Sequence, residues 1–462
     1  MFIGRKKELA SFEDLYRRDE SSLSILYGRR RVGKTRLVQE FIKGKRTIFF
    51  SAQEGDEESN LIALSHAIAG QDKTHYPVFT TLSEALAYIA DESKKEKIVF
   101  FIDEYPYLVK SLGKKVSSIL QNYIDTSLSL SRLMIILCGS SVSFMEDEVL
   151  SGANPLYGRA KLIMKLLPLK YYETALWFPH YSPEEKAVLY GATNGIPYYL
   201  SCMNPSLSLK DNLIMAFFRP NSILLYEQEF ILRQEISDIR SYHAVLNAIA
   251  NGKTKFNEIC DSTRINPGFI LKILTFLKEL DFVEKTVPVG DNENSKKGFY
   301  SIKDLYFNFW YFFVQRYMTV IEQDLMEENY ERLITPLMND YMGRVFERIS
   351  REYLMYKAQL AFPLKDIGSW WGTDNVKKKS IEIDIVAHSA LDSEVIIGSC
   401  KFTNHPVDTD EYELMCDYSK SIAGRNDISF WFFSRSGFTD EMRKIECERI
   451  RLVPIDDMYL LT

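Results

Sequence analysis

The sequence is poor in the features that mark secreted, metal-clustered and membrane-embedded chains. Its 462 residues include six cysteines, at positions 138, 202, 260, 400, 416 and 447, and no two of them have C-x-x-C spacing. This scatter argues against a zinc site and against a disulfide framework. No stretch approaches the roughly 20 apolar residues that span a bilayer, and the N-terminal residues lack the apolar core of a signal peptide. We therefore expect reduced thiols, a cytoplasmic location and no membrane partner.

Positive charge is not in overall excess. The chain has 57 Lys and Arg against 63 Asp and Glu, a formal net charge of −6, which excludes the global basic balance typical of many nucleic-acid binders. The distribution is uneven, because residues 1–50 hold thirteen Lys and Arg against six Asp and Glu. Hydrophobic residues make up 46% of the sequence. The length therefore suits about three domains, each with its own core.

The basic surplus surrounds the most informative stretch, SLSILYGRRRVGKTRLVQEFI, residues 22–42. An apolar strand ends at Tyr27, the pattern Gly28-x-x-x-x-Gly33-Lys34-Thr35 follows, and helical apolar spacing begins at Leu37. Strand, glycine loop and helix form the context that the phosphate-binding P-loop requires. The loop N–H groups would hold phosphate, Lys34 would reach the β- and γ-phosphates, and Thr35 would hold Mg²⁺.

The nucleotide contacts predicted from this loop are Gly28, Arg29, Arg30, Arg31, Val32, Gly33, Lys34, Thr35 and Arg36. The side chains of the four arginines could add phosphate charge or bind nucleic acid. We expect them instead to face solvent or a neighbouring subunit.

Two further apolar strands end in polar residues. In KIVFFIDEYPYL, residues 97–108, the strand ends in Asp103, a predicted Mg²⁺ ligand. Glu104 follows it and would orient the attacking water. RLMIILCGSSVSFM, residues 132–145, reaches Gly139-Ser140-Ser141.

With these strands the sequence resembles the AAA+-type P-loop ATPases, in which a polar residue at this third strand end senses the γ-phosphate. That resemblance makes Ser140 the candidate, with Ser141 as the alternative. FIGRKKELASF, residues 2–12, resembles the opening of archaeal and bacterial ATPases of the signal-transducing (STAND-like) branch, where the segment lies beside the adenine. The resemblance implies that Arg5 contacts the nucleotide.

Two later segments extend the resemblance. NPLYGRAKLIMKLLPL, residues 154–169, resembles the arginine motif of the same family, which implies that Arg159 is an arginine finger or a γ-phosphate sensor. A structural arginine is the alternative. YGATNGIPYYL, residues 190–200, resembles the Gly-x-Pro element of the helical lid.

The middle of the chain predicts a winged helix. Residues 241–290 contain three helical blocks, with breaks at Asn251-Gly252 and at Asn266-Pro267, and two short strands flank the polar turn GDNENSKKG. The third helix offers Lys272 and Lys278 but few side chains that read bases. A structural or interdomain role is therefore favoured over DNA contact.

The C-terminal third predicts a helix, three strands, a helix and a strand, followed by one more helix and strand. This is the core order of restriction-endonuclease-like (PD-(D/E)xK-type) folds. The predicted elements are 339–358, 366–372, 380–389, 394–402, 407–424, 428–434, 438–450 and 451–455.

Asp384 and Lys401 fit the first and last positions of the nuclease signature, but Ser399 stands where an acid is usual. Glu382 lies on the same strand face as Asp384 because the side-chain period is two, and Glu347 lies on the preceding helix. These residues could complete a Mg²⁺ site. A domain that does not cut nucleic acid is the favoured alternative.

Together the patterns predict an α/β chain. The expected domains are a P-loop ATPase core (1–165), a helical lid (166–235), a winged helix (236–315) and a restriction-endonuclease-like domain (316–462). The expected function is Mg²⁺-dependent ATP binding and hydrolysis, coupled to conformational change or assembly. A nucleotide-controlled scaffold and an ATP-gated DNA or RNA nuclease are the alternatives. ATP and Mg²⁺ are the expected cofactors. The candidate partners are ADP, a second copy of the chain, DNA or RNA, and another protein.

Overall fold

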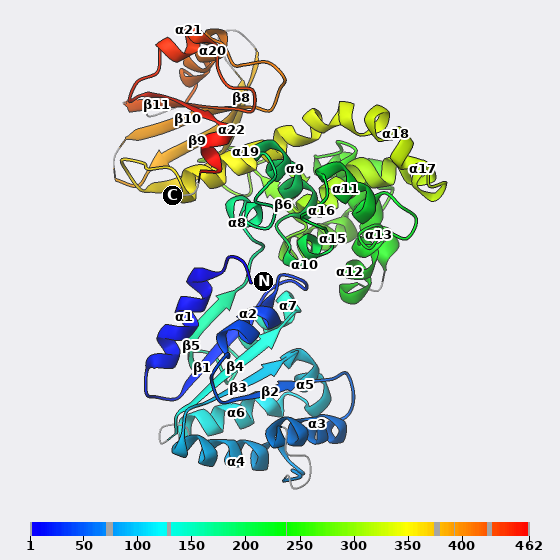
Figure 1. The fold of residues 1–462 in the computed structure, drawn as a ribbon, viewed down its shortest axis with the longest axis vertical. Helices are drawn as coiled ribbons and strands as arrows, with labels where there is room; N and C mark the ends of the chain where they lie inside the picture. The colour runs from blue at the N-terminus through cyan, green and yellow to red at the C-terminus, as the bar shows by residue number, and fades with distance from the viewer. Residues whose placement is uncertain are drawn as a thin grey trace. The chain divides into compact units, whose positions relative to one another are not determined.

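The structure is a computed structural model that describes residues 2–70, 77–126, 131–236, 238–373, 379–391, 393–422 and 427–460. The chain forms two compact units (Figure 1). The first contains Met1–Pro168 and Ile196–Tyr198, and the second contains Leu169–Gly195 and Tyr199–Thr462. Apart from residues 166–168 and 196–198 of the predicted lid, the regions predicted as lid, winged helix and C-terminal domain lie in one unit. Within the described ranges, no helix has the length and hydropathy needed to cross a membrane.

The first unit is built on a parallel sheet, which confirms the predicted α/β class. Its strand order is β2-β3-β4-β1-β5. Strands buried on both faces explain the continuous apolar runs in the sequence. The strands are β1 (Ser22–Tyr27), β2 (Thr47–Ser51), β3 (Ile98–Asp103), β4 (Leu133–Gly139) and β5 (Ala160–Lys165).

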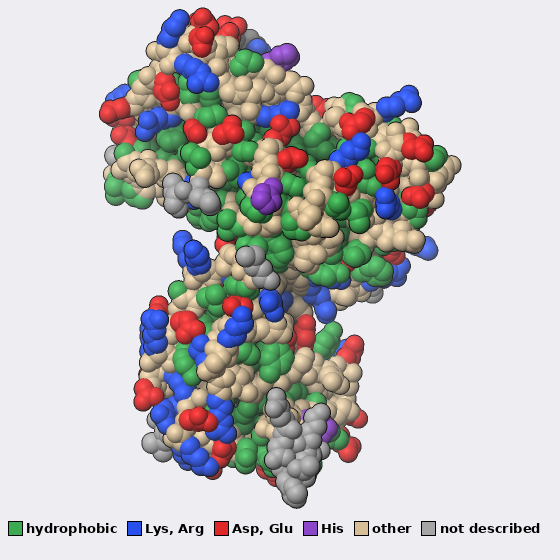
Figure 2. All heavy atoms as spheres, in the orientation of Figure 1, with side chains coloured by type: hydrophobic (Ala, Val, Ile, Leu, Met, Phe, Trp, Pro, Cys, Tyr) green, Lys and Arg blue, Asp and Glu red, His purple; other side chains and the backbone are tan. Residues whose placement is uncertain are grey.

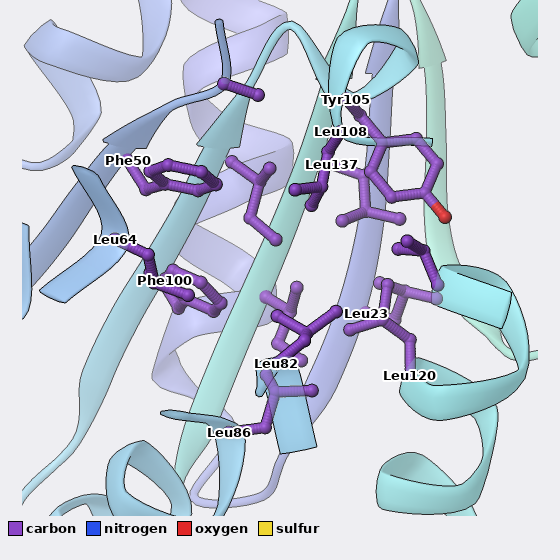
Figure 3. Packing of buried hydrophobic residues seen from close by; sticks show 14 of the residues in the cluster. Leu23, Phe50, Leu64, Leu82, Leu86, Phe100, Tyr105, Leu108, Leu120 and Leu137 are labelled. Atoms are coloured by element: carbon purple, nitrogen blue, oxygen red, sulfur yellow. The ribbon is translucent and has the colours of Figure 1, made fainter. Parts of the chain in front are cut away.

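Helices pack on both faces of this sheet. On one face, Leu23, Phe100 and Leu137 point from the strands towards Leu86 and Leu108 of the covering helices (Figure 3). In β1, β3 and β4 the alternate residues, which face the other side of the sheet, are equally buried. Helices α1 and α2 pack together through Phe12 and Phe41, whose ring centroids are 5.2 Å apart. The helices are α1 (Lys6–Arg17), α2 (Lys34–Phe41), α3 (Glu57–Ala69), α4 (Leu82–Lys95), α5 (Tyr105–Leu112), α6 (Lys115–Thr126) and α7 (Val142–Phe144), which continues into a π-helical turn (Met145–Val149).

The strand order determines which loops meet. Strand β4 lies between β1 and β3, with Tyr27 paired to Gly139 and Ile102 paired to Leu137. All three strands therefore end at the same edge of the sheet. The loop after β1, Ser140 after β4 and Asp103 at the end of β3 come together there, since neighbouring strands are about 4.8 Å apart.

The second unit begins with the helices of the predicted lid and continues into the three helices and two antiparallel strands predicted for residues 241–302. The helices are α8 (Tyr171–Ala175), α9 (Pro183–Thr193), α10 (Pro197–Ser201, whose first two residues belong to the first unit), α11 (Leu209–Phe217), α12 (Glu227–Glu235), α13 (Ile239–Ala250), α14 (Phe256–Thr263) and α15 (Pro267–Glu279). Strands β6 (Val283–Thr286) and β7 (Phe299–Ile302) follow. The break at Asn266-Pro267 is confirmed, because the Asn266 side chain caps α15.

An aromatic helical segment leads to the C-terminal half. The segment comprises α16 (Leu305–Phe309), a π-helical turn (Trp310–Val314) and a 3-10 turn (Gln315–Tyr317). Helix α17 (Met318–Glu322), helix α18 (Met326–Leu333) and a 3-10 turn (Thr335–Leu337) follow. The long helix α19 (Met338–Tyr356) then begins.

The C-terminal sheet has the order β12-β11-β10-β9-β8. Strand β9 is antiparallel to both β8 and β10, whereas β10, β11 and β12 are parallel. The predicted sequence of elements is confirmed, and the likeness to restriction endonucleases stays a prediction. The elements are β8 (Leu364–Thr373), β9 (Ser380–Ser389), β10 (Glu394–Lys401), α20 (Thr409–Ser419), β11 (Asp427–Ser434), α21 (Asp440–Lys444), β12 (Ile450–Pro454) and α22 (Ile455–Met458).

The helix predicted over 438–450 is wrong in length. Helix α21 ends at Lys444, because Cys447 and Ile450 exchange backbone hydrogen bonds in a tight turn that leads into β12.

Two sets of contacts hold the second unit together. The Val289 N–H, in the loop between β6 and β7, donates to the Ser369 carbonyl of β8 at 2.9 Å. The Trp371 ring lies 4.9 Å from that of Phe299. On α19, the buried Glu352 carboxylate accepts hydrogen bonds from the Tyr171 N–H (3.2 Å) and the Tyr190 hydroxyl (2.8 Å). Helix α19 therefore connects the predicted lid to the rest of the unit.

Candidate nucleotide site and a second polar cluster

The loop between β1 and α2 has the backbone of a phosphate cradle. Gly28, Arg31 and Gly33 all have positive φ, at 147°, 69° and 92°. A Cβ at Gly28 would lie 2.4 Å from the Leu166 carbonyl oxygen, so only glycine fits there. A loop in which residues of positive φ are interspersed among the others turns its N–H groups towards one concavity, and such a concavity can bind an anion. The loop therefore fits the phosphates of a nucleotide.

Lys34 is buried at the start of α2. Its Nζ donates to the carbonyls of Gly28 at 2.8 Å and of Arg29 at 2.9 Å. Burial lowers the pKa of Lys34, and the nearby Cys138, Glu104 and Asp103 partly oppose that shift. A phosphate would compete for this ammonium group and would restore its preference for the charged form.

Thr35 and Asp103 meet as the sequence predicts. The Thr35 hydroxyl donates to Asp103 Oδ2 at 2.8 Å. A hydroxyl and one carboxylate are hard oxygen donors of the kind that hold Mg²⁺ together with substrate phosphates. The described residues contain no group of three or more His, Cys, Asp or Glu side chains that could hold a metal alone.

Glu104 and Ser140 lie beside this pair. The Ser140 hydroxyl is within hydrogen-bond distance of both Glu104 carboxylate oxygens, at 2.9 and 2.8 Å. Glu104 itself is left-handed (φ 51°), and its N–H donates to Asp103 Oδ1 at 3.0 Å. Its carboxylate is thereby held at the carboxyl edge of the sheet, where an attacking water would need a base.

The arginines of the loop differ in their surroundings. Arg30 donates to the Tyr107 hydroxyl at 3.2 Å, and the Arg31 guanidinium lies 4.0 Å from the Tyr198 ring centroid. Both side chains are half-buried, as is Arg29, whereas Arg36 is exposed. Arg30 and Arg31 thus each have an aromatic partner within the first unit, and contact of these arginines with a neighbouring subunit stays a prediction.

Arg5 contacts the backbone of the phosphate loop through its side chain. It is buried and left-handed (φ 63°), and it donates to the carbonyls of Val32 at 3.2 Å and Leu167 at 2.6 Å. Glu8 pairs with the same guanidinium at 3.1 Å. Its visible role is to fix the loop backbone, and direct contact with a nucleotide stays a prediction.

Arg159 lies away from this site within the first unit. It directly precedes β5, whose first residue Ala160 pairs with Leu23 near the start of β1. This is the amino edge of the sheet, opposite the P-loop. Its guanidinium forms a two-point ion pair with Asp125, at 2.8 and 2.7 Å. A role as a finger therefore requires the site of a neighbouring chain, and it stays a prediction.

The polar residues predicted in the C-terminal sheet come together in part. Asp384 accepts a hydrogen bond from the Cys400 N–H at 2.7 Å, where β9 and β10 part. Burial, then the Asp384 charge, raises the pKa of Glu347 to about 7. Burial also raises the pKa of Asp384, although the Cys400 hydrogen bond and Lys401 oppose it. Glu382 is exposed, and its charge adds to both shifts.

Glu411 is the member that the sequence analysis missed. This residue of α20 accepts from the Ser399 hydroxyl at 2.7 Å and pairs with Lys401 Nζ at 3.0 Å. Burial alone would lower the pKa of Lys401, but Glu411 and Asp384 raise it overall. The carboxylate beside Ser399 therefore comes from the helix after the strand and not from Glu382. The sequence did contain a signal for this carboxylate. Asp408 caps the helix that follows β10, and Glu411 lies in the first turn of that helix.

Figure 2 shows how charged side chains are distributed on one face of the chain. On the face drawn in Figure 2, the described Lys and Arg side chains are interspersed with Asp and Glu over both units. That view gives no support to a long basic track for nucleic acid.

Comparison with known proteins agrees with the geometry. A family model described as an ATPase domain predominantly from Archaea matches residues 2–203. A second, for archaeal and bacterial proteins of unknown function, matches residues 310–413. An uncharacterized protein of Methanocaldococcus jannaschii is 31% identical over 405 residues, which are 87% of this chain and 88% of that protein.

Two further comparisons cover less. An uncharacterized ATP-binding protein of the same organism is 48% identical over 46 residues, which are 10% of this chain and 78% of that protein. Among solved structures, a Walker-type ATPase of Pyrococcus abyssi aligns with 67% of this chain and 96% of its own, at a TM-score of 0.52 and 20% identity. That likeness supports the fold. Together with the nearly full-length relative, these matches show that the chain belongs to the family of P-loop ATPases found predominantly in Archaea.

Proposed function

We propose that this protein binds ATP with Mg²⁺ and hydrolyses it, and that its nucleotide state controls a conformational change or an assembly step. The observation that carries the proposal is the hydrogen bond between Thr35 and Asp103, 2.8 Å long, at the mouth of a loop with the backbone of a phosphate cradle. Mg²⁺ at this pair would neutralise charge on the β- and γ-phosphates.

The chain's own residues supply the remaining roles. The loop N–H groups and Lys34 bind and orient the phosphates. Glu104 orients the attacking water, and Ser140 fixes Glu104. Catalysis of phosphoryl transfer is mostly positioning and charge stabilisation, which is what these groups provide.

Phosphate release from ATP tests the proposal. The wild-type protein should release phosphate from ATP when Mg²⁺ is present, and this release should stop when EDTA is added. Lys34→Ala should lose nucleotide binding, whereas Glu104→Gln should bind ATP and lose turnover. A wild-type protein that binds no nucleotide would disprove the proposal.

The same Glu104→Gln variant distinguishes a motor that requires ATP turnover from a nucleotide-controlled scaffold. A motor needs turnover, whereas a nucleotide-controlled scaffold needs only binding. If Glu104→Gln retains the cellular function while turnover is lost, the scaffold reading is correct. Client nucleic acids and partner proteins would then be sought in pull-downs with that variant.

A second candidate function is Mg²⁺-dependent cleavage of DNA or RNA by the C-terminal sheet. The meeting of Asp384, Lys401 and Glu411 favours it, since such chemistry needs carboxylates near a lysine. The test is incubation with DNA and with RNA in Mg²⁺ or Mn²⁺, with and without ATP. Cleavage that disappears in Lys401→Ala would support this function, and absence of cleavage in all conditions would rule it out.

A further inference from the structure

Arg31 occupies a backbone conformation that arginine rarely adopts. Its φ is 69°, in the left-handed region, and it lies in the middle of the phosphate loop. A residue other than glycine pays a conformational cost there, and such a conformation persists only when surrounding contacts hold it. Something must therefore keep this part of the loop in its cradle shape.

One contact that holds Arg31 comes from a distant segment of the first unit. The guanidinium of Arg31 lies 4.0 Å from the centroid of the Tyr198 ring, which is a close cation–π distance. The neighbouring Pro197 borders the same loop, because its Cγ is 3.7 Å from where a Cβ on Gly33 would be. Residues 197–198 thus form one side of the cradle.

The chain just before Tyr198 is itself firmly placed. Asn194 and Gly195 both have positive φ (54° and 65°), and the Gly195 carbonyl accepts a hydrogen bond from the Leu169 N–H at 2.9 Å. Helix α9, which ends at Thr193, is fixed to α19 by the hydrogen bond from the Tyr341 hydroxyl to the Gly191 carbonyl, 2.7 Å long. The turn at Asn194 and Gly195 is therefore fixed within the second unit.

We propose that Tyr198 is a positioning residue for the phosphate loop. Its ring holds Arg31 and thereby keeps the loop in the conformation that binds phosphate. This inference rests on the proposed nucleotide binding, and it adds a residue that affects the dissociation rate of the nucleotide.

The test is the dissociation rate of a fluorescent ADP analogue, measured by stopped flow on the full chain. Tyr198→Leu should speed release about three- to tenfold, the range of a lost cation–π contact. Tyr198→Phe keeps the ring and should stay within about twofold of wild type. Lys43→Gln, at an exposed ammonium near the end of α2, is the matched control for a general change in surface charge.

The Arg31→Gly variant tests whether Tyr198 acts by holding the left-handed backbone of residue 31. Glycine adopts φ 69° without strain, so Arg31→Gly no longer needs the ring. In the Arg31→Gly background, Tyr198→Leu should leave the dissociation rate unchanged. A double-mutant cycle on these two positions measures the coupling directly.

The outcomes separate this inference from the proposed function. If wild type binds no ADP analogue, both are wrong. If the wild type binds the analogue, and Tyr198→Leu changes the dissociation rate equally in the wild-type and Arg31→Gly backgrounds, only the role of Tyr198 is wrong. A Tyr198→Phe variant as fast as Tyr198→Leu would also overturn it, because the ring would then not be the determinant.

Discussion

The hydroxyl of Ser140 lies 2.9 and 2.8 Å from the two carboxylate oxygens of Glu104. These residues end neighbouring strands, so the contact follows from the strand order. Through this contact Ser140 holds the carboxylate that we propose orients the attacking water.

Ser140→Ala should therefore slow turnover without weakening binding. Misplacing a catalytic base costs on the order of tenfold to a hundredfold in kcat, whereas no loop N–H group is disturbed. Steady-state phosphate release and titration with an ADP analogue measure the two quantities. Ser141→Ala is the informative comparison, since a larger loss of kcat in that variant would transfer the role to Ser141.

Arg5→Met should destabilise the first unit. The change removes the donor for the carbonyls of Val32 and Leu167 at a site where the side chain is buried. Loss of such charge-assisted hydrogen bonds costs about 2–4 kcal/mol. Thermal unfolding should show a lower Tm, and nucleotide should restore part of the loss. An unchanged Tm with weakened nucleotide affinity would instead support the predicted direct contact of Arg5 with nucleotide.

Glu352→Gln should loosen the second unit. Its carboxylate accepts from the Tyr171 N–H and the Tyr190 hydroxyl inside the protein. An amide offers one oxygen in place of two, so one buried donor loses its partner, at a cost of about 1–3 kcal/mol. Glu328→Gln, on the exposed face of α18, is the matched control. Limited proteolysis and Tm should both respond to the first variant and not to the second.

Glu347 should make stability depend on pH. Its pKa in the folded chain is about 7, above the ordinary 4.5, so the folded state retains a proton that the unfolded state has released. Stability should therefore fall as pH rises from about 4.5 to 7, with a slope of at most about 1.4 kcal/mol per unit. The side chain is 27% exposed, and solvent screening reduces the total to about 1–2 kcal/mol.

Glu347→Gln removes this titration. The variant should be more stable than wild type at pH 8 and similar at pH 4.5, in thermal melts with EDTA present. A pH dependence identical in the two proteins would contradict the assignment.

The sequence predicted those parts of the site that depend on local pattern. The glycine loop, Asp103 and Glu104 each follow a strand whose apolar run is unmistakable, and parallel strands bring such ends together. Ser140, at the end of a third such strand, was named through the resemblance to AAA+-type ATPases. The order of elements in the C-terminal half was predicted from hydrophobic periodicity.

The remaining contacts depend on tertiary structure. The stacking of Tyr198 on Arg31 joins residues far apart in the chain, and no spacing rule connects them. Glu411 lies outside the (Asp/Glu)-x-Lys spacing, because it reaches Ser399 from a helix and not from the strand. The position of Arg159 could have been inferred, since a residue just before a parallel strand lies at the amino edge, opposite the phosphate loop.

The contact between Val289 and Ser369 has one more consequence. Strand β8 is the last strand on its side of the C-terminal sheet, and an uncovered strand edge is a template for pairing with other chains. The loop between β6 and β7 occupies part of that edge. A fragment that begins after this loop would expose the unpaired backbone of β8 and should aggregate more readily than the whole chain.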